Sequence, residues 1–189
     1  MPYRSVEFRA GECYHIYNRG NNYSDIFFER QNYLYFLRQM RKYLVSDVLD
    51  IIAYCLMPNH YHLLLRLNAD TFSRPMQRLA LSYTKAINKR YGRVGSLFQG
   101  RFKALHVDRD EYLLHLSRYI HLNPVMAGRV RKPEDWEFSS YQEFVGMRDG
   151  KLPKPDVVLS QFPSPDAYRA FVESYTDGDE ERIRHLMLD

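Results

Sequence analysis

Two histidines stand one residue apart in an apolar stretch of this sequence. His60 and His62 belong to the segment HYHLLLRL, at positions 60–67. Because side chains alternate between the two faces of a β-strand, a strand here directs both imidazoles to one face and Tyr61 to the other. Two imidazoles on one face can bind a single divalent metal ion, although two hydrogen-bonded structural histidines would show the same spacing.

Tyr119 and Asn123 form a second pair, in the segment DRDEYLLHLSRYIHLN at positions 108–123. Residues four apart lie on one face of a helix, so a phenol and an amide oxygen would project together. His115, four residues before Tyr119, could share this face and supply a base or a further ligand. A packing tyrosine, a structural histidine and a helix-ending asparagine would also fit, and both interpretations remain open at this point.

These side chains need a scaffold, and the apolar periodicity of the chain indicates one. Strands are expected at 12–18, 50–57, 60–67 and 102–107, and helices at 29–45 and 71–91. Pro58-Asn59 favours a tight turn between the middle two strands, which then pair as a hairpin. The order strand, helix, strand, strand, helix, strand predicts an α+β fold of the ferredoxin-like, split βαβ type, with an antiparallel sheet and helices on one face.

A further helix, which would carry Tyr119, is expected to follow the fourth strand. Asp108 and Glu111 have the spacing of a capping box at its start. Pro124 disfavours helical geometry at the residue before it, so this helix is expected to end at Asn123.

Length and composition set the wider frame. A chain of 189 residues suits one main domain, expected at 1–150, followed by a C-terminal extension at 151–189 without an assigned role. Two widely separated cysteines indicate neither a disulfide framework nor a Cys-rich zinc site. No segment has the apolar length of a signal peptide or a membrane span, so a cytoplasmic protein without a membrane partner is expected.

Charge and aromatic content are compatible with a nucleic-acid partner. The formal net charge is +4, and Tyr, Phe and Trp make up 15% of the chain, which leaves rings that can stack on unpaired bases. The stretch 85–103 contains no acidic residue and includes Lys89, Arg90, Arg93, Arg101 and Lys103, which can neutralise phosphates.

Rings and a second loop accompany that basic stretch. Tyr91 and Phe98 could stack on bases, although a solvated helix end followed by a loop with a core Phe would give the same sequence pattern. Arg19 and Asn21 lie in a polar loop after the first strand and could read bases near the foot of a hairpin.

Four segments together resemble a known family. MPNHYHLLL at 57–65 resembles the His-hydrophobic-His signature of HUH single-strand endonucleases. RYIHLNPVMAG at 118–128 resembles the tyrosine segment of REP-associated tyrosine transposases, in the IS200-like group of that superfamily. YHIYNRGNN at 14–22 and GSLFQGRFKA at 95–104 extend the likeness to roughly residues 10–145.

The resemblance implies a role for each residue of the two pairs. His60, His62 and Asn123 would bind a divalent metal, and Tyr119 would attack a DNA phosphate to form a 5′-phosphotyrosine. An amide oxygen suits Mg²⁺ or Mn²⁺, and two imidazoles favour Mn²⁺. The sequence departs from the family pattern at Tyr61, whose ring is still largely apolar, and in using asparagine where relatives can use glutamine.

The implied substrate is single-stranded DNA with a REP-type hairpin, which a transposase cuts and rejoins. For the protein itself, a monomer is slightly favoured. An autonomous insertion-sequence transposase and a noncatalytic hairpin-binding protein remain alternatives.

Overall fold

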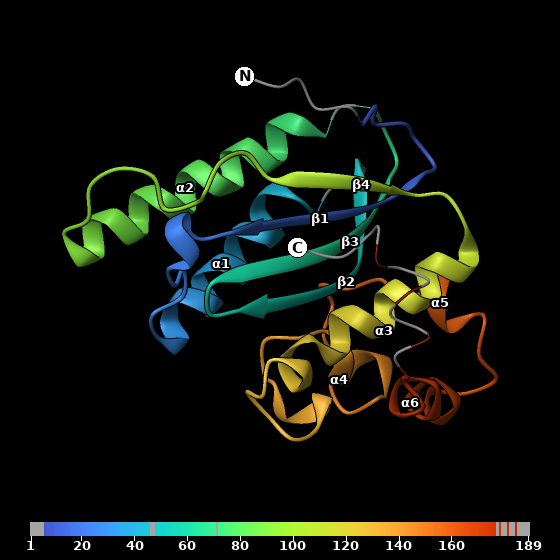
Figure 1. Cartoon of the computed structure of the whole chain (residues 1–189). Helices are drawn as coiled ribbons and strands as arrows, with labels where there is room; N and C mark the ends of the chain where they lie inside the picture. Colours follow the sequence, from blue (N-terminus) through green and yellow to red (C-terminus); the bar gives the residue numbers. More distant parts are fainter. Residues whose placement is uncertain are drawn as a thin grey trace.

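A computed structural model describes residues 6–45, 48–70, 72–176, 178, 181 and 184. Within this part of the chain, four strands form one antiparallel sheet in the order β2-β3-β1-β4 (Figure 1). The strands are β1 (Cys13–Arg19), β2 (Leu49–Met57), β3 (His60–Leu67) and β4 (Lys103–Val107). The predicted hairpin is confirmed, because β2 pairs antiparallel with β3.

Helices cover both faces of this sheet (Figure 1). The helices α1 (Arg30–Tyr43) and α2 (Ser73–Tyr91) pack on one face, as the split βαβ pattern predicts. The helix α3 (Asp110–Met126) packs on the other face. The shorter elements are η1 (Asn21–Tyr23), η2 (Pro133–Asp135), α4 (Tyr141–Phe144), α5 (Asp156–Leu159) and α6 (Pro165–Glu173).

Alternation along β3 divides its side chains between the two cores. Tyr61, Leu63 and Leu65 are buried with α1 and α2, whereas Leu64 is buried with α3. His62 lies opposite Tyr17 of β1, so these two side chains share the α3 face. The predicted orientation of Tyr61, away from the histidines, is confirmed.

The ends of the helices agree only partly with the sequence analysis. α2 ends before Gly92, whose φ of 62° is the left-handed conformation that favours glycine. α3 is capped by Arg109 without a side-chain hydrogen bond, so the predicted capping box does not form.

The predicted end of α3 at Asn123 is also wrong, because the helix continues through Pro124 to Met126. Proline removes one hydrogen-bond donor, but here it lies in the last turn, and the backbone N–H of Ala127 still bonds to the Asn123 carbonyl at 3.0 Å. Burial of Leu122 and Asn123 favours this extra turn. Asn123 therefore keeps its helical position one turn after Tyr119.

The described part of the predicted C-terminal extension packs against α3. Tyr168 of α6 is buried, and its hydroxyl lies 2.8 Å from Nδ1 of His121 and 3.0 Å from Oγ of Ser117. Nearer the start of the extension, Lys154 Nζ lies 2.5 Å from Asp50 of β2. Among the described helices, none combines the length and the apolar composition that crossing a bilayer requires.

Candidate active site

The structure brings together the two residue pairs that the sequence analysis singled out. Nε2 of His60, on β3, lies 3.0 Å from Oδ1 of Asn123, on α3. The ring of His62 lies 5.0 Å from that of His60 and 5.5 Å from that of Tyr119, measured between centroids. Two imidazoles from a strand and two side chains from a helix thus meet on the α3 face of the sheet.

The hydrogen bonds of His60 determine which of its ring nitrogens carries the proton. Nδ2 of Asn59 donates to the Tyr23 carbonyl at 3.2 Å, which turns Oδ1 of Asn59 toward Nδ1 of His60 at 2.7 Å. An amide oxygen only accepts, so Nδ1 of His60 donates. Burial lowers the pKa of His60, although the contact with Asn123 raises it in part. The neutral ring then presents the Nε2 lone pair beside Oδ1 of Asn123, and a cation would stabilise two such facing acceptors.

His62 is completely buried, and one of its ring nitrogens has no hydrogen-bond partner among the described residues. Its Nδ1 lies 2.9 Å from Nε2 of His15, while its Nε2 has no hydrogen-bond partner among the described residues. Burial, followed by the nearby His60 and His15, holds the pKa of His62 well below its usual range. A buried nitrogen without a partner is costly, and a neutral imidazole nitrogen in this position is suited to bind a metal.

His60, His62 and Asn123 therefore fit a divalent metal ion, provided that all three contribute. Within the described ranges, no three His, Cys, Asp or Glu side chains cluster closely enough to hold an ion. A metal here depends on the amide of Asn123 in addition to His60 and His62. Nitrogen and neutral oxygen ligands suit Mn²⁺, and Mg²⁺ accepts the oxygen ligand more readily than the imidazoles.

Sequence reasoning missed His15, which supports this site from β1. The ring of His15 is fully buried and stacks on His62 with centroids 5.1 Å apart. A second hydrogen-bonded partner commonly fixes the tautomer and orientation of a metal-binding histidine. Alternation along the segment YHIYN places His15 and Tyr17 on one face, but only the pairing of β1 with β3 shows that this face is the one with His62.

A pocket of about 450 Å³ opens beside Tyr119. Its lining includes Arg19, His60, Tyr119, Asn123 and Arg129, and contains no acidic residue. Two arginines without a nearby carboxylate in the lining favour an anionic ligand such as a phosphodiester. Sequence reasoning missed Arg129, which directly follows the segment that carries the family resemblance.

His115 lies elsewhere. Its Nδ1 is 2.8 Å from Nη2 of Arg118, and its ring contacts Phe171 of α6. It does not line the pocket beside Tyr119. The hypothesis that His115 serves as a base or a further ligand is therefore wrong for this structure.

The basic stretch 85–103 separates into two parts in space. Lys89 and Arg90 are exposed at the end of α2, where Arg90 forms an ion pair of 2.6 Å with Glu29. Arg93 follows, with its guanidinium 5.5 Å from the ring centroid of Phe28. Glu29 thus offsets part of a charge that looked uninterrupted in the sequence.

The two rings predicted to stack on bases differ in accessibility. Phe98 is only 5% exposed and packs against Tyr61 in the core, so a stacking role for it is wrong. Tyr91 is 37% exposed, and its hydroxyl donates to Glu29.

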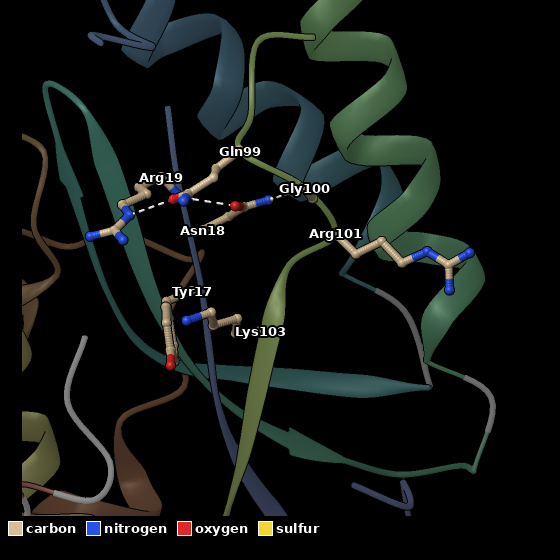
Figure 2. A pocket seen from close by; sticks show the side chains of 7 residues that line it. All are labelled: Tyr17, Asn18, Arg19, Gln99, Gly100, Arg101 and Lys103. Atoms are coloured by element: carbon tan, nitrogen blue, oxygen red, sulfur yellow. Dashed lines mark hydrogen bonds between the residues drawn. The ribbon is translucent and has the colours of Figure 1, made fainter. Parts of the chain in front are cut away.

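Arg101 and Lys103 lie closer to the active site, in the second part of the basic stretch. With Arg19 they line a second pocket, between the end of β1 and the start of β4 (Figure 2). Asn21 is exposed in the neighbouring loop, and its backbone N–H donates to the Leu97 carbonyl at 2.9 Å. The polar loop that contains Asn21 is therefore hydrogen-bonded to the basic stretch 85–103.

Comparison with known proteins tests the predicted family. The family model described as Transposase IS200 like matches residues 12–123, which include all four residues of the candidate site. This chain belongs to that family. The matched range begins just before β1 and ends at Asn123.

Two relatives of this transposase family member carry the name REP-associated tyrosine transposase. One, from Haemophilus influenzae, is 29% identical over 107 residues, and the match covers 51% of this chain and 61% of the relative. The other, from Escherichia coli, is 28% identical over 98 residues, with 51% of this chain and 56% of the relative covered. The chain thus spans about three fifths of the length of these relatives.

A solved structure supports the fold. It is described as a REP-associated tyrosine transposase bound to a REP hairpin, and it matches with a TM-score of 0.64 at 19% identity. The match covers 82% of this chain and 98% of the other. The predicted α+β fold is confirmed by this likeness.

Proposed function

We propose that this protein is a transposase that cuts and rejoins single-stranded DNA next to a hairpin, with Tyr119 as the nucleophile. One observation carries the proposal: α3 brings Tyr119 and Asn123 against His60 and His62 of β3, with Nε2 of His60 3.0 Å from Oδ1 of Asn123. The names of the two relatives and the hairpin bound to the matching structure support hairpin DNA as the substrate.

His60, His62 and Asn123 would hold the divalent metal, Mn²⁺ or Mg²⁺. A bound cation polarises the phosphoryl group and reduces the repulsion that its negative oxygens exert on a nucleophile. Asn59 and His15 keep the two imidazoles in the required orientation through their hydrogen bonds at 2.7 and 2.9 Å.

Tyr119 performs the covalent step. Its hydroxyl loses a proton to solvent and forms an oxygen–phosphorus bond, while the bond from phosphorus to the 3′-oxygen breaks and that oxygen takes up a proton. The products are a 5′-phosphotyrosine and a free 3′-hydroxyl. A second 3′-hydroxyl can then attack the same phosphorus and release Tyr119, which rejoins DNA without another energy source.

The charged residues around the pocket position the substrate. Arg19 and Arg129 line the space beside Tyr119 and can pair with backbone phosphates on either side of the scissile one. Tyr119 is only 4% exposed, so its hydroxyl is accessible only to an extended single strand that enters the pocket. Duplex DNA is therefore expected to be a poor substrate.

The decisive experiment tests for a covalent adduct. The parent protein, incubated with a hairpin-bearing single strand and Mn²⁺ or Mg²⁺, should form a DNA adduct that survives denaturation. Tyr119→Phe should bind the same DNA without forming the adduct, whereas Tyr112→Phe, on the same helix, should form it normally. Adduct formation by Tyr119→Phe at the parent rate would exclude Tyr119 as the nucleophile.

Other results of this assay identify the alternatives. Cutting without an adduct would indicate a nuclease that uses water, and binding without cutting or adduct would indicate a hairpin-binding protein. His60→Ala combined with His62→Ala should abolish metal-dependent cutting while the protein remains folded by circular dichroism. Flanking chromosomal repeats would distinguish a REP-associated transposase from an autonomous insertion-sequence enzyme.

A further inference from the structure

A second pocket, of about 260 Å³, adjoins the pocket beside Tyr119. Figure 2 shows it between the end of β1 and the segment that leads into β4. It is lined by Tyr17, Asn18, Arg19, Gln99, Gly100, Arg101 and Lys103. Apart from Arg19, none of these residues has a part in the proposed chemistry, and the lining contains three cations and no acid.

Arg19 lies between the two pockets, because it lines both of them. Its Nε donates to Oε1 of Gln99 at 2.6 Å, and its guanidinium lies 4.2 Å from the ring centroid of Tyr23. Tyr17 of the second pocket lies on the same face of the sheet as His62, with their ring centroids 6.3 Å apart. A strand with its phosphate at Tyr119 can therefore reach the second pocket with an adjacent nucleotide.

The groups in this pocket have the chemistry to hold a nucleotide. Lys103 points toward Tyr17, with its ammonium 5.8 Å from the ring centroid, and can pair with a phosphate (Figure 2). Gln99 is exposed, and because its Oε1 accepts from Arg19, its Nε2 amide can donate to a base edge.

The remaining lining residues have other functions. Asn18 donates to the Gly100 carbonyl at 3.1 Å and accepts from the Arg19 backbone at 2.9 Å, so it shapes the pocket wall. The Arg101 side chain extends away from the other lining residues in Figure 2. We expect it to contact the DNA backbone farther along the strand.

We propose that this second pocket binds one unpaired nucleotide of the substrate strand, next to the nucleotide that is cut. Gln99 donates to an acceptor on the base edge, Lys103 pairs with the phosphate, and Arg19 separates this nucleotide from the one at Tyr119. The proposal rests on the proposed function, since it concerns the same DNA strand. It makes Gln99 a residue that determines which base is accepted near the cut.

An abasic scan tests this assignment. Single abasic sites are placed in turn along the single-stranded flank of a hairpin oligonucleotide, and binding is measured by fluorescence anisotropy for the full chain. One abasic position next to the cut should weaken binding by the parent by about tenfold, near the upper value for one lost hydrogen bond. The other flank positions should have smaller effects.

Two variants connect that position to the pocket. Gln99→Ala removes the amide, and Gln99→Glu keeps an acceptor for Arg19 but removes the donor to the base. Both should reduce the abasic effect at that one position to less than about threefold. Gln161→Glu, a matched change of an exposed glutamine in the C-terminal extension, should retain the parent profile.

The outcomes separate this inference from the proposed function. An abasic profile that is the same in Gln99→Ala as in the parent would overturn the second pocket as a nucleotide site, even if Tyr119 forms its adduct. Loss of the single-position effect in both Gln99 variants would support it, even if no adduct formed. The adduct assay on the unmodified oligonucleotide reports the proposed function by itself.

Discussion

His15 is the residue whose replacement should reveal most about the proposed metal site. His15→Phe keeps an aromatic ring of similar size next to Tyr17 and His62, whose ring centroids lie 4.9 and 5.1 Å away. It removes the 2.9 Å hydrogen bond to Nδ1 of His62. His62 can then rotate or change its tautomer, so its Nε2 would no longer be held in place for a metal.

The magnitudes follow from the burial of both histidines. Loss of a hydrogen-bonded partner behind a metal ligand typically lowers metal affinity by about 10–100-fold, or roughly 1.4–2.7 kcal/mol. Both His15 and His62 are 0% exposed, so the unpaired Nδ1 should also lower the free energy of unfolding by about 1–3 kcal/mol. A protein of this size should remain folded at 25 °C after such a loss.

Titration calorimetry with Mn²⁺ measures the first effect, and thermal unfolding in a chelator measures the second. His106→Phe is a matched control, because His106 is exposed on β4 and its Nε2 contacts Glu12 rather than the site. The control should bind Mn²⁺ like the parent. A folded His15→Phe variant that binds Mn²⁺ within twofold of the parent would refute the reasoning.

Three further predictions concern charge, DNA binding and the core. Burial raises the pKa of Asp50, but hydrogen bonds from Lys154 and neighbouring donors outweigh this and leave it lowered. Asp50→Asn should therefore cost about 1–2 kcal/mol of unfolding free energy at pH 7, and the difference from the parent should shrink as the pH falls below about 4, in urea titrations at each pH. Replacing Arg101 and Lys103 with alanine should reduce the slope of log affinity against log salt for single-stranded DNA by about 1.4, and an unchanged slope would exclude both as phosphate contacts. Phe98→Ala should lower the unfolding free energy by roughly 3–5 kcal/mol, whereas a cost below about 1 kcal/mol would contradict its place in the core.

The sequence by itself determined the order of the four strands and the long helices, and which residues form each of the two pairs. Period-two alternation in 60–67 fixes which side of a strand His60 and His62 share, and helical spacing fixes that Tyr119 and Asn123 share a face. These relationships are local, because they follow from the geometry of one strand or one helix. The split βαβ order follows in the same way from the succession of apolar patterns.

The end of α3 shows how packing overrides a local preference. Pro124 predicts a break at Asn123, but the buried side chains of the last turn hold the helix to Met126. This extra turn decides that Asn123 stays helical and faces His60. Local rules on proline contain no information about what the helix packs against.

Only the tertiary structure decided which distant residues meet. The pairing of β1 with β3 places His15 behind His62, and α2 returns toward α1, so that Glu29 contacts Arg90. The same packing directs Phe98 into the core. Register, strand order and helix placement depend on contacts between residues far apart in the chain, so a sequence pattern that reports only near neighbours cannot specify them.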